Sequence, residues 1–167
     1  RTAELGASED RVSTWRKLSH AKRLLELDPG RGREVVLEHA QKASGDLRAE
    51  LLCLLASRSK LDPASTHALT DEILFGTSSR TRTKIAATLS RAHPRGEWFV
   101  PIRIELEKTA LQRGPLTPAG VLLIRTQVEA GPGPGLECVL RLLPKLRTRV
   151  DFARILRWLR PERTDLD

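Results

Sequence analysis

The feature that most constrains the fold of this chain is a regular alternation of helical segments and turn residues. The triplet Leu-Asp-Pro at residues 27–29 recurs 34 residues later, at residues 61–63. Further breaks contain glycine and proline, and they divide the sequence into about nine segments with the apolar spacing of helices. Self-similarity at about 30–40 residues, with two helices in each period, is typical of a stack of helical pairs.

Composition also favours helices over strands. Leu, Ala, Arg and Glu dominate, whereas aromatic residues make up 4% of the 167 residues and Tyr is absent. We predict an all-α fold, a right-handed stack of antiparallel helical pairs of the α-solenoid kind, in a single domain over 1–167. Its predicted parts are an N-terminal helix over 1–27 and helical pairs over 28–60, 61–93, 94–130 and 131–161. An irregular helical bundle is the alternative.

Capping residues indicate where individual helices begin. Asp46 is expected to cap a helix that ends near residue 57, and Ser65 or Thr66 a helix that ends at residue 75. Thr117 is expected to cap a helix whose first residue is Pro118. The stretch "DPGRG" is expected to be a break, with the next helix beginning near Arg33.

In period and helix–turn–helix pattern, residues 28–160 resemble HEAT and armadillo repeats. The tryptophan, glycine and tyrosine pattern of TPR repeats is missing, as is the ankyrin "TPLH". Residues 116–146 also resemble the TAL-effector DNA-binding repeat, in which an "LTP" helix precedes a base-reading loop. The shared residues are Leu116, Thr117, Pro118, Val121, Ile124, Leu136, Glu137, Val139, Arg141, Leu142, Leu143, Pro144 and Leu146. Because the loop is two residues longer here and the pattern occurs once, we interpret this resemblance as convergence on a helical-pair consensus.

The net charge of +8 is unevenly distributed. The predicted first helices (31–43, 64–75, 97–112, 134–145) hold 7 basic and 8 acidic residues, whereas the second helices (46–60, 80–92, 117–130, 147–160) hold 13 and 4. We predict that a basic concave face binds a partner or phosphates through Arg80, Arg82, Lys84, Arg91, Arg147, Arg149, Arg154, Arg157, Arg160 and Trp158.

The closing stretch "LRTRVDFARILRWLRPER" (146–163) contains part of this predicted face. Phe152, Ile155, Leu156 and Leu159 form one apolar stripe, which is expected to pack on the preceding helix while the arginines face away. The stripe is too narrow for a membrane-surface helix. Of the other tryptophans, Trp98 is expected to anchor a helix start in the core, and Trp15 to lie in a core or an interface.

Nothing in the sequence indicates catalysis, a cofactor or a metal. The histidines are scattered, without a neighbouring nucleophile or metal-ligand spacing: His20, His39, His67 and His93. Cys53 and Cys138 lie in apolar helical runs and are expected to be free thiols, as in a reducing compartment. We therefore predict a non-enzymatic protein.

Two glycine-rich stretches resemble phosphate loops. "PGRGRE" (29–34) places glycines and arginines before a helix, where free N–H groups can bind an anion, but it lacks the GK[ST] of a P-loop. "GPGPG" (131–135) contains prolines, which have no N–H to donate. We interpret the first as an inter-repeat turn and the second as a stiff linker.

Our leading hypothesis is a helical-repeat module that binds a protein partner with an acidic surface or segment, as part of a larger protein or complex. The alternative is binding to the backbone of DNA or RNA, and a small enzyme or effector domain is a third class. The longest apolar run, Leu51–Ala56, is too short to span a bilayer, so we expect no membrane partner. The expected compartment is intracellular and cytoplasmic, with the nucleus also open.

Overall fold

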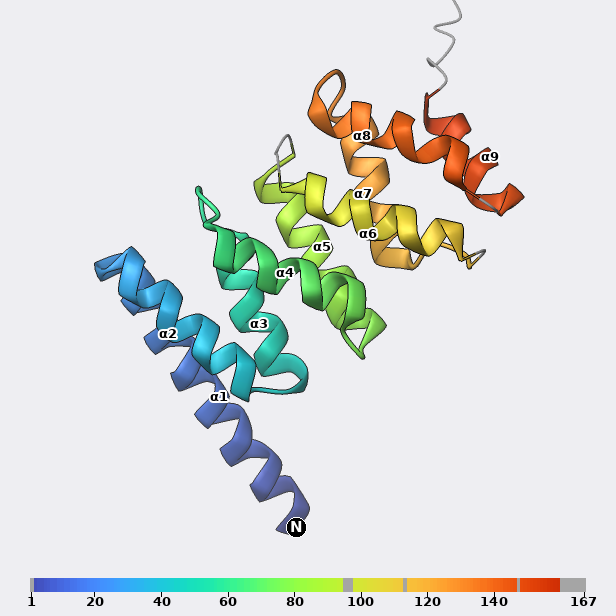
Figure 1. Cartoon of the computed structure of the whole chain (residues 1–167). Coiled ribbons are helices and arrows are strands. Elements are labelled where there is room, and N and C mark those ends of the chain that lie inside the picture. The colour runs from blue at the N-terminus through green and yellow to red at the C-terminus, as the bar shows by residue number, and fades with distance from the viewer. Residues whose placement is uncertain (1, 95–97, 113, 147, 160–167) are drawn as a thin grey trace, which may run out of the picture. The chain divides into compact units, whose positions relative to one another are not determined.

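The computed structural model describes the backbone of residues 2–94, 98–112, 114–146 and 148–159, with side chains from residue 12 on except that of residue 109. These residues form nine α-helices, a short 3-10 helix and no strand, so the all-α prediction is confirmed (Figure 1). The helices are α1 (Thr2–Leu27), α2 (Pro29–Lys42), α3 (Gly45–Ala56), α4 (Pro63–Phe75), α5 (Ser79–Ala92), α6 (Phe99–Leu111), α7 (Pro118–Glu129), α8 (Pro134–Leu142), η1 (Leu143–Lys145) and α9 (Arg149–Leu159).

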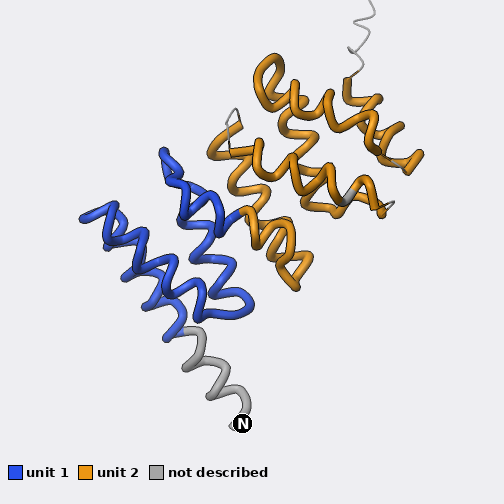
Figure 2. Tube along the Cα trace, in the orientation of Figure 1, with its two compact units in different colours: residues 1–69 blue, residues 70–167 orange. Residues whose placement is uncertain are grey.

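The helices gather into two compact units, residues 1–69 and 70–167, and the boundary falls inside α4 (Figure 2). In unit 1, α1 packs on α2 and α3, and α2 also packs on α3. In unit 2, α7 packs on α5, α8 and α9, while α6 packs on α8. Contacts between helices one and two places apart in the chain are those of a helical stack. The single domain over 1–167 and its four pair ranges stay predictions.

The helices predicted to come first in each pair begin at nearly even intervals. These helices begin at Pro29, Pro63, Phe99 and Pro134, at intervals of 34, 36 and 35 residues. The second helices begin at Gly45, Ser79, Pro118 and Arg149, at intervals of 34, 39 and 31 residues. The second set is less regular because the segment that joins α6 to α7 is longer than the segment that joins α2 to α3.

The repeated Leu-Asp-Pro triplet marks the start of a helix. Asp28 caps α2 and accepts a hydrogen bond from the N–H of Arg31 at 3.1 Å, and Pro29 is the first helical residue. Asp62 does the same for α4, since its carboxylate accepts from the N–H of Ser65 at 3.0 Å and from its hydroxyl at 2.7 Å. The predicted caps Ser65 or Thr66 are therefore wrong, and so is the predicted start of α2 near residue 33.

Two other predicted helix starts have opposite outcomes. Thr117 caps α7 as predicted, because its hydroxyl accepts from the N–H of Gly120 at 3.2 Å and Pro118 follows it. The predicted cap Asp46 is wrong: α3 begins one residue earlier, and Ser44 occupies the capping position. The triplet Leu-Thr-Pro stands at the start of α7, a predicted second helix, whereas Leu-Asp-Pro stands at the starts of α2 and α4, two predicted first helices. Such a triplet therefore marks the start of a helix but does not show whether that helix is the first or the second of its predicted pair.

The stretch "PGRGRE" is the beginning of α2 and the place where α2 crosses α1. Gly32 is buried, and a Cβ there would lie 2.7 Å from the backbone nitrogen of Leu25. The N–H of Gly32 donates to the carbonyl of Asp28 at 2.8 Å, and the N–H of Arg31 is bound to the Asp28 carboxylate. These N–H groups are therefore occupied, and the glycine serves close helix packing.

The core of each unit is aliphatic. Leu25 and Leu52 are buried in unit 1, as are Ile85 and Leu123 in unit 2, and each such side chain contributes about 1.5–3 kcal/mol of transfer free energy. Trp98 is 7% exposed and donates from its indole N–H to the carbonyl of His93 at 2.9 Å, so it anchors the start of α6 as predicted.

Candidate partner-binding surfaces

The exposed face of α5 is basic. Arg80, Lys84 and Arg91 are all exposed, and at about 100° per residue they fall within about 40° of one another around the helix. Ile85 and Leu89 on the opposite side are buried. Arg80 lies in the first turn of α5, where the helix dipole disfavours a cation and where no acidic residue offsets it. Helix stability therefore does not explain this charge.

Arg82 was predicted to belong to the same face, but its side chain contacts the protein instead. Its Nε donates to the carbonyl of Ile73 at 2.8 Å, and a terminal nitrogen lies 3.5 Å from the carbonyl of Gly76. These carbonyls belong to the end of α4, where a cation and a donor are both favourable. We therefore assign Arg82 to the structure of unit 2 and remove it from the candidate surface.

The second basic group lies on α9. Arg149, Arg154 and Arg157 are exposed, and Arg154 lies 3.7 Å from a carboxylate oxygen of Asp151. Trp158 is half-buried, so it is not an open platform for stacking. The predicted residues Arg147 and Arg160 lie outside the described residues.

Helix α7 lies between these two basic helices and contacts both of them (Figure 1). Its exposed Arg125 and Glu129 form an ion pair at 2.6 Å and contribute no net charge. The basic residues that the sequence singled out on α5 and α9 are thus on two helices that flank a third in the same unit. We define the basic surface as the six exposed side chains Arg80, Lys84, Arg91, Arg149, Arg154 and Arg157.

Helix α9 also exposes apolar side chains, and this corrects the predicted stripe at Phe152 only, because Ile155 is buried and Leu156 and Leu159 are half-buried. Phe152 and Val150 are 40% and 67% exposed, whereas Asp151 and Ile155 are 4% and 1% exposed. The reason is the carboxylate of Asp151, which accepts hydrogen bonds from the N–H of Leu116 at 2.9 Å and the hydroxyl of Thr148 at 2.6 Å. These bonds turn Asp151 inward and leave its two neighbours facing solvent.

Helix α6 of the same unit has an exposed apolar stripe that the sequence analysis did not identify. Val100, Ile104 and Leu111 are 37%, 44% and 52% exposed. They lie at helical positions i, i+4 and i+11, which share one side of the helix. The signal could have been found in the sequence, because α6 is apolar on more sides than a half-buried helix needs.

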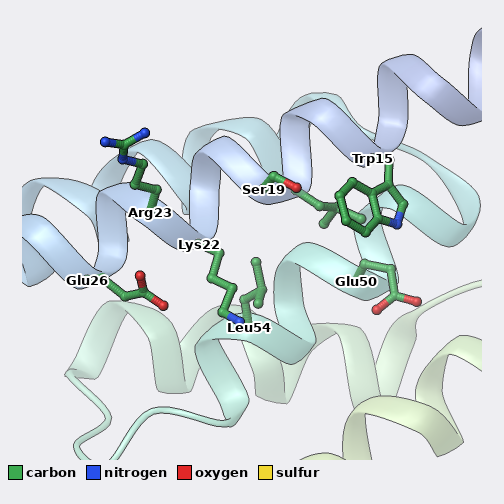
Figure 3. A pocket seen from close by; sticks show the side chains of 8 residues that line it. Trp15, Ser19, Lys22, Arg23, Glu26, Glu50 and Leu54 are labelled. Atoms are coloured by element: carbon green, nitrogen blue, oxygen red, sulfur yellow. The ribbon is translucent and has the colours of Figure 1, made fainter.

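Unit 1 contains a groove of about 540 Å³ between α1 and α3 (Figure 3). It is lined by Trp15, Leu18, Ser19, Lys22, Arg23, Glu26, Glu50 and Leu54. Trp15 is 74% exposed and lies with Glu50 at one end, while the Lys22 side chain extends toward Leu54 (Figure 3). Trp15 is therefore not in the core, and its charged neighbours are balanced in sign.

A smaller pocket of about 240 Å³ lies on the other side of α1, against α2. Its lining is Arg16, Lys17, His20, Ala21, Val35 and His39, with no acidic residue among them. We call it the basic pocket.

Among the described side chains, no three histidine, cysteine or carboxylate groups lie close enough to hold a metal ion. Cys53 is half-buried and Cys138 buried, and neither forms a disulfide. No helix within the described ranges is both long and apolar enough to cross a membrane.

In comparisons with protein-family models, with curated proteins and with solved structures, nothing matches this chain. The resemblances to HEAT, armadillo and TAL-effector repeats therefore depend on the sequence pattern alone and stay predictions.

Proposed function

We propose that this chain is a non-enzymatic helical-repeat module that binds an acidic protein segment containing apolar side chains, through unit 2. The observation that carries the proposal is that arginines and apolar side chains are exposed together on α9: Val150 lies within about 60° of Arg154 and Arg157 around the helix, and Phe152 within about 60° of Arg149. Arg149, Arg154 and Arg157 are exposed on the same helix as Val150 and Phe152. Arginine and exposed aromatic residues together are the composition of protein–protein contact surfaces. The predicted concavity of this surface stays a prediction.

The two kinds of side chain would contribute differently to binding. Phe152 and Val150 lie about 160° apart around α9, so the partner segment would cover both by passing round the helix. Covering them would supply most of the affinity, because each apolar side chain taken out of water contributes about 1.5–3 kcal/mol. Exposed ion pairs contribute about 0–1 kcal/mol each, so the arginines would chiefly select an acidic partner and speed its association. The exposed Trp15 in unit 1 is a further residue type that protein partners commonly cover.

Nucleic-acid binding is the second candidate, because all six side chains of the basic surface are positively charged and exposed to solvent, where phosphate groups could contact them. Phosphate contacts would make affinity fall steeply with salt and would not need Val150 or Phe152. The apolar side chains therefore distinguish the two functions.

The test uses fluorescence anisotropy of two labelled probes with the full chain. One is an acidic amphipathic peptide that alternates Glu with Leu and Phe, and the other is a short mixed-sequence DNA or RNA strand. We expect the peptide to bind, and Phe152→Ser with Val150→Ser to weaken it by about tenfold or more. The double change Arg149→Glu with Arg157→Glu should weaken peptide binding more at low salt than at high salt, because salt screens the charges.

Matched controls lie in unit 1. Leu27→Ser removes an apolar side chain that is 74% exposed, and Lys60→Glu reverses an exposed charge. Neither should change peptide binding. Peptide affinity that is insensitive to both pairs of changes in α9 would contradict the proposal. Binding of the nucleic acid alone, lost on charge reversal and unaffected by Phe152→Ser, would establish the second candidate.

A further inference from the structure

We propose that the basic pocket of unit 1 binds a phosphate monoester group. This inference concerns unit 1 and goes beyond the function proposed for unit 2. Helix α1 contributes Arg16, Lys17 and His20, and α2 contributes His39, around a space of about 240 Å³.

The described lining of the pocket contains cations and imidazoles, and the carboxylate of Glu38, which interacts electrostatically with His39, lies outside that lining. Two arginine or lysine cations and two imidazoles line it, and no carboxylate does. The nearby carboxylate of Glu38 is held by Lys42 at 2.5 Å, and that ammonium lowers the pKa of the Glu38 carboxyl below its usual value. Convergence of like charges raises the local potential for anions, and a bound anion would relieve their repulsion.

A hydrogen bond within α2 fixes the tautomer of the neutral His39 ring. Its Nδ1 lies 2.7 Å from the carbonyl of Val35, and a carbonyl only accepts, so Nδ1 must carry the hydrogen. The other ring nitrogen, Nε2, is then the one available to an anion. As a neutral ring it accepts the proton of a singly protonated phosphate, and as imidazolium it donates to a phosphate oxygen.

The chemistry of the lining favours phosphate over a carboxylate. A guanidinium such as that of Arg16 binds two phosphate oxygens through parallel N–H donors, and Lys17 adds a point charge. A phosphate monoester carries about −1.5 to −2 charges at neutral pH, against one for a carboxylate. Ala21 and Val35 complete the lining with apolar surface, which suits the short carbon chain that carries the phosphate in a phosphorylated serine or threonine.

The pocket is large enough for a single phosphate group and smaller than the usual site for a whole metabolite. Its volume of about 240 Å³ lies below the about 300–1,000 Å³ typical of small-molecule sites. Inorganic phosphate and a phosphorylated side chain share the recognised chemistry, so the experiment below distinguishes these two sources.

The test follows histidine ring signals by two-dimensional NMR of the full chain at constant pH. The chain has only four histidines, so His67 and His93 serve as internal controls for His20 and His39. Inorganic phosphate is titrated first, then a phosphoserine peptide and its unphosphorylated form. We expect saturable shifts of His20 and His39 alone, with the phosphoserine peptide binding at least about tenfold more tightly than its unphosphorylated form.

The matched variants lie on opposite sides of α1. Arg16→Gln with Lys17→Gln should reduce phosphate affinity by about tenfold or more, whereas Lys22→Gln with Arg23→Gln, which change the groove of Figure 3, should leave it unchanged. Far-UV circular dichroism checks that both pairs keep their helix content. Equal shifts at all four histidines, no saturation, or equal losses in the two pairs would overturn the site. Saturation by inorganic phosphate without preference for the phosphopeptide would support the site and identify free phosphate as its ligand.

Discussion

Replacing Gly32 by alanine tests the close crossing of α1 and α2. The added Cβ would lie 2.7 Å from the nitrogen of Leu25 and 2.8 Å from the carbonyl carbon of Leu24. Both are backbone atoms, so no side-chain rotation can relieve the contact. To reach 3.4 Å, where ordinary van der Waals contact begins, α1 must move by 0.7 Å relative to α2.

Two effects of opposite sign determine the magnitude. Alanine is favoured over glycine inside a helix by about 1 kcal/mol, which would stabilise the variant. Forcing atoms into a packed contact costs about 1–3 kcal/mol, and a backbone neighbour places this site in the upper part of that range. We therefore expect Gly32→Ala to lower the free energy of unfolding by about 1–2 kcal/mol.

The matched control is Gly30→Ala, two residues earlier in the same helix. A Cβ at Gly30 would meet only a carboxylate oxygen of Asp28, at 3.5 Å. This variant should keep the stability of the parent or gain up to about 1 kcal/mol. Urea denaturation followed by far-UV circular dichroism measures both. A Gly32→Ala protein as stable as Gly30→Ala would refute the crossing geometry.

Three further predictions concern polar groups. Asp151→Ala should lower the free energy of unfolding by about 2–3 kcal/mol in the same assay, because it leaves a buried N–H without its acceptor and removes two further contacts; a loss below about 0.5 kcal/mol would contradict this role. Arg82→Gln should cost about 1 kcal/mol of stability through the end of α4 and leave peptide anisotropy unchanged, whereas a loss of peptide binding would return Arg82 to the basic surface. Burial raises the pKa of the Asp62 carboxyl, but hydrogen bonds from Ser65 and the charge of Arg33 outweigh it and lower the pKa below 3.8. The stabilisation by this carboxylate is therefore present above that value and is lost as the pH falls through the lower pKa of the folded state. The difference in free energy of unfolding between the parent and Asp62→Asn should decrease below about pH 4. A difference that stays constant with pH would contradict this role.

Predictions that depended on neighbouring residues were the most accurate. Helix α7 begins at Pro118 as predicted, because its cap, its first proline and its apolar spacing all lie within the helix or beside it. The starts of α2 and α4 were misplaced by a few residues, since Asp-Pro was interpreted as a break although it is a cap followed by a favourable first residue.

Predictions about which side chains face a partner were less accurate, because they depend on contacts between distant residues. Nothing near Arg82 in the sequence shows that it reaches the carbonyl of Ile73. Apolar spacing predicted the stripe on α9 and holds for the buried Ile155, but a hydrogen bond from the N–H of Leu116, 35 residues away, turns Asp151 inward and leaves Phe152 exposed. A polar group that is satisfied inside the core thus overrode the hydrophobic pattern.

The amino-acid pattern was enough to predict a stack of helices whose starts recur about every 35 residues, and to place the excess positive charge on the predicted second helices. Helix propensity, capping residues and the spacing of apolar residues involve neighbours in the chain, so they can be identified from the sequence. The packing of the helices sets which cations and which apolar side chains are exposed, and it gives α1 a mixed groove on one side and a basic pocket on the other. The exposure of a side chain, and the meeting of side chains from two helices in one pocket, depend on how separate helices pack. That packing is set by contacts between residues that lie far apart in the sequence.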